Sequence, residues 1–273
     1  MDRDTVTLAQ LEVSACTAEL YLNGVPVLRL VSAAGSAPAE NVAVEQLLVP
    51  GRNTLELLVE PGPTPGTARS AERDLPFHPA RSQARLIRVR EDEEASPGNG
   101  TVLMETSFTW SDSSAQSRRF PVSSSAIGDL GLANGRWPWL EAPSLAASKS
   151  LDEEARAVLN QLADAARAGS IDRFWELSRL ATTDVLRAYP AMTESSMREE
   201  LAGFLAIASQ SEGSVVVSSP DAQDFRLVGG SRLLELVDKD WTPSLKVRTP
   251  GRDSATGYPI FLARIGGILR IVR

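Results

Sequence analysis

The sequence predicts a two-domain protein, an antiparallel β-sandwich followed by an α+β domain in which helices precede a curved antiparallel sheet. A chain of 273 residues is too long for one ordinary core, and two domains of about 120 to 140 residues are expected. Residues 1–126 hold short strand-like segments separated by turns, whereas residues 150–273 begin with helical stripes and change to a strand period after Gly213. Between them, residues 127–149 are rich in Gly, Pro, Ala and Ser and form the expected linker.

The first domain contains at least seven strand candidates and one strong hairpin signal. The candidate strands are 6–13, 19–22, 25–30, 42–49, 53–60, 84–90 and 102–110. Asn23-Gly24 stands between the second and third of them, and this dipeptide is the residue pair that a two-residue hairpin turn favours. Short strands with frequent turns predict a sandwich for this half of the chain.

Two segments of the first domain carry a family resemblance. A hairpin around Asn23-Gly24 is followed by the turn Pro50-Gly51 and then by Asn53-Thr54-Leu55-Glu56-Leu57, which opens the candidate strand 53–60. This order resembles a pattern that recurs in galactose-binding-like and related β-sandwich domains. The resemblance implies a sandwich fold, and it assigns no catalytic residue or ligand position.

The second domain is expected to begin with three or four helices. Ser150 and Glu153 match a capping box at the start of the first helix, and Gly169 is a plausible stop. Ser170 then caps a helix through Leu180, a separate short helix is expected at 184–189, and Thr193 caps a longer helix. The strands expected after the helices are 215–217, 225–228, 233–237, 244–248, 260–265 and 268–272. This element order resembles the NTF2-like cone of ketosteroid-isomerase-type and SnoaL-type proteins.

Composition excludes several function classes. The chain has one histidine, His78, and one cysteine, Cys16, so His- or Cys-based catalysis and zinc or haem sites lack residues, and we expect no cofactor and no metal. The net charge of −7 argues against nucleic acid as a partner.

The sequence shows neither a secretory signal nor an apolar run long enough for a membrane helix, and its Arg-over-Lys bias is typical of GC-rich bacterial genomes. We therefore expect a bacterial cytoplasmic protein.

The first set of candidate site residues concerns a protein partner. Trp137 and Trp139 flank Pro138 in the predicted linker, where large aromatic side chains could anchor another protein, and Arg118 and Arg119 are further candidates. The alternative for the two tryptophans is that they pack inside the chain, between the domains.

The second set of candidates concerns a pocket. Asp238, Asp240 and Trp241 form a compact acidic and aromatic cluster at a strand end, where a carboxylate could act as a base or bind a cation. The alternative is a solvated hairpin end with Trp241 covering the core. In an NTF2-like cone, Tyr258, Trp175 and Tyr189 could line the cavity, although core packing explains the same aromatic residues.

These features favour a non-catalytic binding protein that recognises another protein, of the kind represented by immunity and adaptor proteins of toxin or secretion systems. One alternative is a small-molecule or carbohydrate-binding protein, which requires a concave pocket lined by aromatic and polar groups. Another is a cofactor-free NTF2-like isomerase, lyase or hydrolase, which requires a buried carboxylate that faces a tyrosine.

Overall fold

The computed structural model describes residues 5–33, 35–61, 72–73, 79–90, 99–110, 118–119, 121–130, 137–211, 213–249, 251 and 255–273. The chain divides into two compact units, Met1–Gly135 and Arg136–Arg273. The boundary between the units falls inside the segment predicted as a linker. His78 and the acidic run at 91–94 lie outside the described residues.

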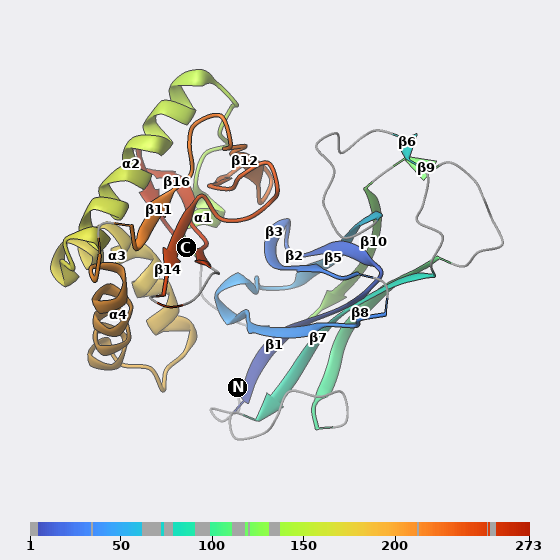
Figure 1. The fold of residues 1–273 in the computed structure, drawn as a ribbon. Coiled ribbons are helices and arrows are strands. Elements are labelled where there is room, and N and C mark those ends of the chain that lie inside the picture. The colour runs from blue at the N-terminus through green and yellow to red at the C-terminus, as the bar shows by residue number, and fades with distance from the viewer. Residues whose placement is uncertain are drawn as a thin grey trace. The chain divides into compact units, whose positions relative to one another are not determined.

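The first unit is built of antiparallel β-sheets, as the sequence predicts (Figure 1). One sheet has the strand order β4-β1-β7-β8, the other has the order β10-β5-β2-β3, and β6 and β9 form a short pair. The bounds are β1 Thr5–Ser14, β2 Cys16–Leu22, β3 Val25–Val31, β4 Ala39–Ala43, β5 Arg52–Pro61, β6 Glu72–Arg73, β7 Ala80–Arg90, β8 Thr101–Trp110, β9 Arg118–Arg119 and β10 Val122–Asp129, with the short 3-10 helix η1 at Glu45–Leu47.

Two asparagines explain the motif that carries the sandwich resemblance. Asn23 and Gly24 both adopt positive φ, 54° and 76°, as the turn between β2 and β3 requires. The Asn23 side chain donates to Leu47 O and to Asn53 Oδ1, each at 2.8 Å, and accepts from Thr54 N at 2.9 Å. Asn53 is fully buried and donates to Val49 O and Gly51 O at 2.9 Å. The motif therefore joins two turns of the sandwich.

The structure corrects two details of the first unit. Residues 42–49 were expected to form one strand, but β4 ends at Ala43 and η1 follows. Val44, Leu47 and Leu48 are buried at a spacing of three and one residues, which fits a single helical turn. The unit also extends beyond residue 126, because β10 continues to Asp129 and pairs with β5 along its whole length.

The second unit contains helices followed by antiparallel sheets, again as predicted (Figure 1). The helices are α1 Pro138–Glu141, α2 Lys149–Arg167, α3 Ile171–Ala188 and α4 Glu194–Ala208. The strands are β11 Val215–Val217, β12 Arg226–Val228, β13 Leu233–Glu235, β14 Leu245–Arg248, β15 Ala255–Tyr258, β16 Phe261–Ile265 and β17 Ile268–Ile271. One sheet has the order β11-β14-β15 and the other has the order β12-β13-β16-β17.

The helix ends differ in part from the predicted ones. Ser148, rather than Ser150, caps α2 by accepting a hydrogen bond from Leu151 N at 3.1 Å. Thr193 caps α4 as predicted, in a reciprocal capping box with Ser196. The separate helix predicted at 184–189 is the last part of α3, which continues without a break because no Gly or Pro interrupts it.

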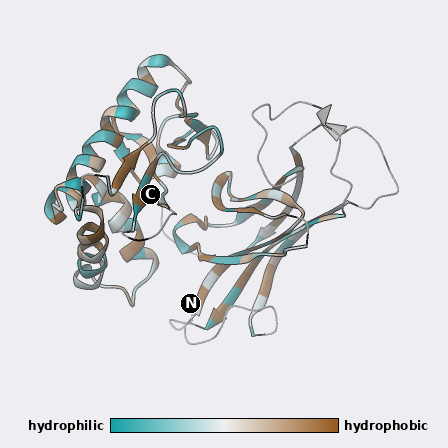
Figure 2. Cartoon of the chain, in the orientation of Figure 1, coloured by the Kyte–Doolittle hydropathy of each residue, from teal (hydrophilic) through white to brown (hydrophobic). Residues whose placement is uncertain are grey.

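The helices pack against one face of the two sheets. Buried residues of α2 and α4 share a core with strand residues that include Leu234, Leu245, Val247, Leu262 and Ile271. Because strand residues alternate between the faces, the neighbours of these leucines and valines point away from the helices. Bands of hydrophilic and hydrophobic residues alternate along α2 in Figure 2, as expected for a helix with one buried side. This division into two faces decides where the candidate residues lie.

Candidate functional site

The predicted acidic and aromatic cluster forms a tight turn. Trp241 N donates to Asp238 O at 2.9 Å, and Asp238 N donates to Thr242 O at 2.8 Å. Trp241 has a φ of 67°, a conformation that is costly for a large side chain, and it is buried with 1% of its surface exposed. The guanidinium of Arg226 lies 5.8 Å from the centre of the Trp241 ring, and Arg226 also forms an ion pair with Glu235. Packing of the indole therefore stabilises a strained turn.

Asp238 is buried and fully engaged by neighbouring side chains. Its carboxylate accepts hydrogen bonds from Ser218 Oγ at 2.5 Å, from Ser244 Oγ at 2.8 Å and from Lys246 Nζ at 2.7 Å. The carboxylate thus forms an ion pair with the lysine and accepts charge-assisted hydrogen bonds from the two hydroxyls. This arrangement ties the turn to Lys246 of β14.

Asp240 is exposed at the same turn. It accepts hydrogen bonds from Thr242 N at 3.1 Å and from Thr242 Oγ1 at 2.6 Å. Partial burial raises its pKa, but the Thr242 hydrogen bonds and the charge of Lys246 outweigh burial and give a net lowering. Asp240 is therefore ionised at neutral pH and serves the turn locally.

Tyr258 lies on the opposite face of the β11-β14-β15 sheet from the Asp238 network. In the register of β14 and β15, Tyr258 is paired with Leu245, and both contact the helix-covered core. Lys246, the next residue, points to the other face and reaches Asp238. The four predicted pocket residues are therefore not assembled in one site, and the carboxylate–tyrosine pair of the enzyme hypothesis is not formed by Asp238 and Tyr258.

The candidates for partner binding are placed as follows. Trp137 and Trp139 are buried, with 1% and 5% of their surfaces exposed, and α1, which begins directly after Trp137, lies against β16. Burial makes the two indoles inaccessible to a partner in this conformation, and their anchoring role stays a prediction. Arg118 and Arg119 form β9, which pairs with β6; their side chains lie outside the described part of the structure.

A groove of about 300 Å³ lies on the helix-covered side of Tyr258, between α3 and α4. We call it the α3–α4 groove. It is lined by Phe174, Trp175, Ser178, Thr182, Met197, Glu200, Leu201, Phe204 and Tyr258. Successive lining residues of each helix lie one, three or four positions apart, so that one side of each helix faces the groove. Its surface is mainly aromatic and aliphatic, with a few polar groups, as is typical of binding sites in proteins.

Three aromatic rings form the floor of the groove. Phe174 is buried and contacts Phe204 and Tyr258 edge to face, with ring centres 5.9 and 5.7 Å apart. Phe204 and Tyr258 contact each other at 5.3 Å. Rings in such mutual contact are held firmly, because each limits the rotation of the others. The floor is therefore a preformed apolar surface contributed by α3, α4 and β15.

Two of the polar groups in the groove are satisfied within α3. Ser178 Oγ donates to Phe174 O at 2.8 Å, and Thr182 Oγ1 donates to Arg179 O at 3.0 Å. These hydroxyls do not require a ligand, because the carbonyl oxygens of their own helix accept their protons.

The other two polar groups of the groove belong to Tyr258 and Glu200, and they have no such partner within their own elements. Among the described residues, neither the Tyr258 hydroxyl nor the Glu200 carboxylate has a hydrogen-bond or ion-pair partner. Burial raises the pKa of Tyr258 to about 12, so its hydroxyl remains a hydrogen-bond donor at neutral pH. Glu200 is exposed at the groove edge. The groove thus offers one donor and one anionic acceptor beside an apolar floor.

Arg198 contacts Trp175, one of the groove residues, and links the two helices. Its guanidinium lies 4.5 Å from the centre of the Trp175 ring and forms ion pairs with Asp172 of α3 at 3.1 Å and Glu194 of α4 at 3.0 Å. The hydrogen bonds to Glu194 and Asp172 raise the pKa of Arg198. Its positive charge is therefore balanced by two carboxylates, and it holds the Trp175 ring in place.

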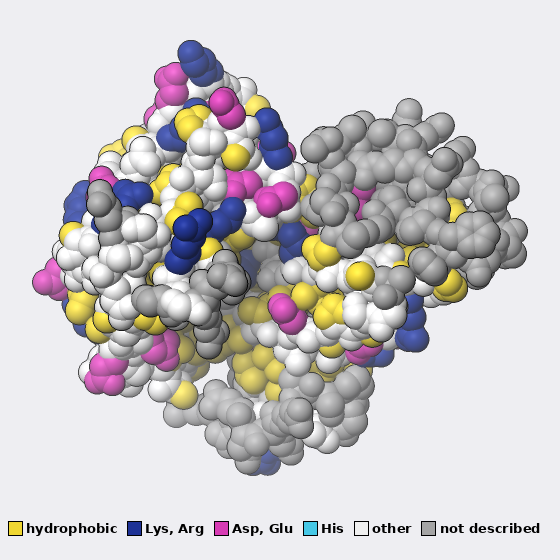
Figure 3. Space-filling model, viewed as in Figure 1, with side chains coloured by type: hydrophobic (Ala, Val, Ile, Leu, Met, Phe, Trp, Pro, Cys, Tyr) yellow, Lys and Arg dark blue, Asp and Glu magenta, His cyan; other side chains and the backbone are white. Residues whose placement is uncertain are grey.

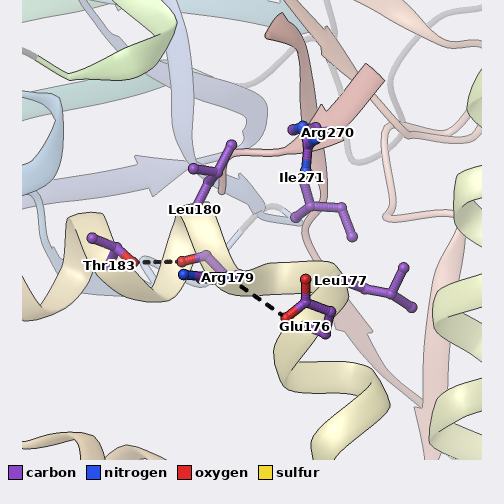
Figure 4. Close-up of a pocket in the computed structure, with 7 residues that line it drawn as sticks. All are labelled: Glu176, Leu177, Arg179, Leu180, Thr183, Arg270 and Ile271. Atoms are coloured by element: carbon purple, nitrogen blue, oxygen red, sulfur yellow. Dashed lines mark hydrogen bonds and ion pairs between the residues drawn. The ribbon is translucent and has the colours of Figure 1, made fainter. Parts of the chain in front are cut away.

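A second depression of about 310 Å³ lies between α3 and β17, on the other side of α3 (Figure 4). It is lined by Glu176, Leu177, Arg179, Leu180, Thr183, Arg270 and Ile271. Glu176 and Arg179 are 4.0 Å apart, and Thr183 Oγ1 donates to Arg179 O at 2.7 Å. No aromatic residue lines this depression, and its acidic and basic groups partly offset each other. The α3–α4 groove is therefore the stronger candidate.

We also searched the described residues for a reactive thiol, a metal-binding cluster and a membrane-spanning helix. Cys16 is buried, and burial raises its pKa to about 11, so the thiol is protonated at neutral pH. No group of three His, Cys, Asp or Glu side chains suited to a metal ion occurs among the described residues. None of the described helices has both the length and the apolar character needed to cross a membrane. Figure 3 shows acidic and basic side chains interspersed on the visible face.

Comparison of the chain with protein-family models, with curated proteins and with solved structures finds no match in any of the three.

The groove includes some of the residues that the sequence suggests for a cavity. Tyr258 and Trp175 line it, whereas Tyr189 caps the end of α3 and Asp240 lies at the turn after β13, so neither is part of it. The spacing of Met197, Leu201 and Phe204 predicts a helix after Thr193, and it does not indicate that these residues line a groove. Their half-buried state becomes visible only when α3 and α4 are placed side by side. Glu200, among these residues, was the available signal, because a charge there is unusual for a fully buried face.

Proposed function

We propose that the protein is a non-catalytic binding protein that recognises another protein through the α3–α4 groove. The observation that carries this proposal is the apolar groove between two helices, lined by Trp175, Met197 and Leu201 and floored by packed aromatic rings. Grooves of this kind accept apolar side chains of a partner segment, and Met and aromatic residues are enriched at such interfaces.

The biological setting is part of the proposal. A bacterial cytoplasmic location and a role like that of immunity or adaptor proteins agree with the acidic composition and the two-unit plan, but they rest on analogy. The resemblances to galactose-binding-like sandwiches and to the NTF2-like cone are proposed on the same footing. Both are consistent with the order of elements in the two units.

Affinity purification from the native host tests the proposal. Met197→Glu places a charge inside the groove, and Ile268→Glu makes the same kind of change on β17, where the side chain is 59% exposed and outside the groove. We expect a stoichiometric partner with the wild type and with Ile268→Glu, and loss of that partner with Met197→Glu. Circular dichroism checks that both variants are folded. Retention of the partner by Met197→Glu, or a wild type that purifies alone, would contradict the proposal.

Binding of a small apolar or carbohydrate ligand is a second candidate function. The volume of about 300 Å³ and the aromatic lining of the groove favour it specifically, because ligand pockets begin at about this size and sugars stack on aromatic rings. Native mass spectrometry separates the two functions. A ligand of low mass that copurifies with the wild type, and not with Met197→Glu, would favour the small-molecule function over protein recognition.

A further inference from the structure

The α3–α4 groove carries a charge pattern that restricts its occupant. Arg198, the basic side chain that contacts Trp175 of the groove, is balanced by Asp172 and Glu194, whereas Glu200 has no ion-pair partner among the described residues. An unbalanced carboxylate therefore stands directly beside an apolar surface. The whole chain has a net charge of −7, which adds a long-range attraction for positively charged partners.

The hydrogen-bonding groups of the groove add a second restriction. The Tyr258 hydroxyl is a donor without an acceptor among the described residues, and it lies in the groove with the Phe174 and Phe204 rings. A partner that covers this hydroxyl must supply an acceptor, since leaving a buried donor unsatisfied is costly. A backbone carbonyl oxygen of a polypeptide meets this need.

We propose that the occupant of the α3–α4 groove is a basic amphipathic segment of a partner protein. An apolar side chain of the segment lies on the Phe174, Phe204 and Tyr258 floor, and a neighbouring Lys or Arg forms an ion pair with Glu200. A carbonyl oxygen of the segment accepts from the Tyr258 hydroxyl. This inference rests on the proposed function and adds the chemical class of the partner segment to it.

The tryptophan distribution provides a direct reading of groove occupancy. Of the five tryptophans, Trp110, Trp137, Trp139 and Trp241 are at most 6% exposed, whereas Trp175 is half-buried and lines the groove. Acrylamide quenching of intrinsic fluorescence therefore reports mainly on Trp175. The variant Trp175→Phe verifies that the signal comes from this residue.

Three short peptides without tryptophan test the inference on the full-length protein. They carry the same Leu residues and differ only in whether Lys, Gln or Glu occupies the remaining positions. We expect the Lys peptide to bind most tightly and to protect Trp175 from acrylamide, the Gln peptide to bind more weakly and the Glu peptide weakest of all. The Lys peptide should also weaken most with added salt.

A matched pair of variants isolates the local contact. Glu200→Gln removes the groove carboxylate, and Glu199→Gln removes the exposed neighbouring charge of α4, which does not line the groove. Both change the net charge equally. We expect Glu200→Gln to weaken binding of the Lys peptide by about fivefold, an ordinary value for a partly exposed ion pair, and Glu199→Gln to weaken it by less than about twofold.

The outcomes separate this inference from the proposed function. Equal binding of all three peptides, or equal effects of Glu200→Gln and Glu199→Gln, would overturn the basic occupant while apolar binding in the groove stands. Failure of every peptide to protect Trp175 would also overturn it. In that case the capture experiment with Met197→Glu still decides independently whether the groove binds a protein.

Discussion

Replacing Asp184 with Asn is expected to stabilise the second unit at neutral pH and to flatten the dependence of its stability on pH. Asp184 lies in the second half of α3 and is 4% exposed. Burial raises the pKa of its carboxyl from 3.8 to about 6, and the charge of Arg187 offsets only part of this increase. The folded protein therefore binds this proton more tightly than the unfolded chain does.

The direction and the size of the effect follow from that difference. Below pH 3.8 the carboxyl is protonated in both states, and the folded state carries no penalty from it. As pH rises from 3.8 to about 6, the folded state becomes less stable relative to the unfolded state, because only the unfolded chain releases this proton easily. Above pH 6 the loss of stability is constant. A difference of about two units corresponds to a ceiling of ~3 kcal/mol. Because solvent screens part of the interaction, we expect about 1 to 2 kcal/mol.

Urea unfolding followed by ellipticity at a helix-sensitive wavelength measures this effect. All the α-helices among the described residues belong to the second unit, so the signal follows that unit. Asp184→Asn should be more stable than the wild type at pH 7.5, equal to it near pH 4, and nearly insensitive to pH between. Asp221→Asn, at an exposed position, is the matched control for the loss of one charge and should leave the stability at pH 7.5 unchanged. An Asp184→Asn variant that is less stable than the wild type at pH 7.5 would refute the reasoning.

Three further predictions concern residues that hold the fold. Asn53→Ala removes a buried side chain with several hydrogen bonds and should destabilise the first unit by about 2 to 3 kcal/mol, seen as faster amide exchange in β2 and β5. Asp238→Ala leaves Lys246 and two hydroxyls without their acceptor and should cost about 3 kcal/mol in thermal unfolding, against less than about 1 kcal/mol for Asp240→Ala. Trp137→Ala should cost about 3 to 5 kcal/mol of stability in urea, as expected for a buried indole; a smaller cost would mean that the ring is not packed as described.

The parts of the fold that could be predicted from the sequence are those in which a residue type strongly favours one local structure, such as a hairpin turn or a helix cap. Asn23-Gly24 forms the expected hairpin because both residues tolerate the positive φ of the turn. Thr193 caps α4 because its hydroxyl accepts a backbone N–H that the helix itself cannot satisfy. The fold class follows from the change of period between the two halves of the chain, and the structure confirms it.

The sequence-based assignments of secondary structure were wrong where the same residues fit more than one local structure. The segment 42–49 is apolar enough for a strand, but the burial of Val44, Leu47 and Leu48 is satisfied equally well by one helical turn. Strand β15 was not predicted, because Ala255–Tyr258 carries no apolar alternation and is placed by its pairing with β14. Such pairing joins residues distant in sequence, and periodicity within a segment does not contain it.

The candidate site was predictable only in part for the same reason. Asp238 and Tyr258 are both near β14, and residue type alone gave no reason to separate them. The register of β14 with β15 places Tyr258 beside Leu245 on the helix side, while Lys246 and Asp238 lie on the other. A difference of one residue in a strand thus decides which candidates share a site.

The central claim, that the α3–α4 groove binds a protein partner, is tested most directly by fluorine NMR of the full-length protein labelled with 5-fluorotryptophan. Each of the five tryptophans gives its own signal, and Trp175→Phe identifies the one from the groove. When the captured partner is added, the account predicts that the Trp175 signal shifts while those of the four buried tryptophans change little. A saturating partner that leaves the Trp175 signal unchanged would contradict it.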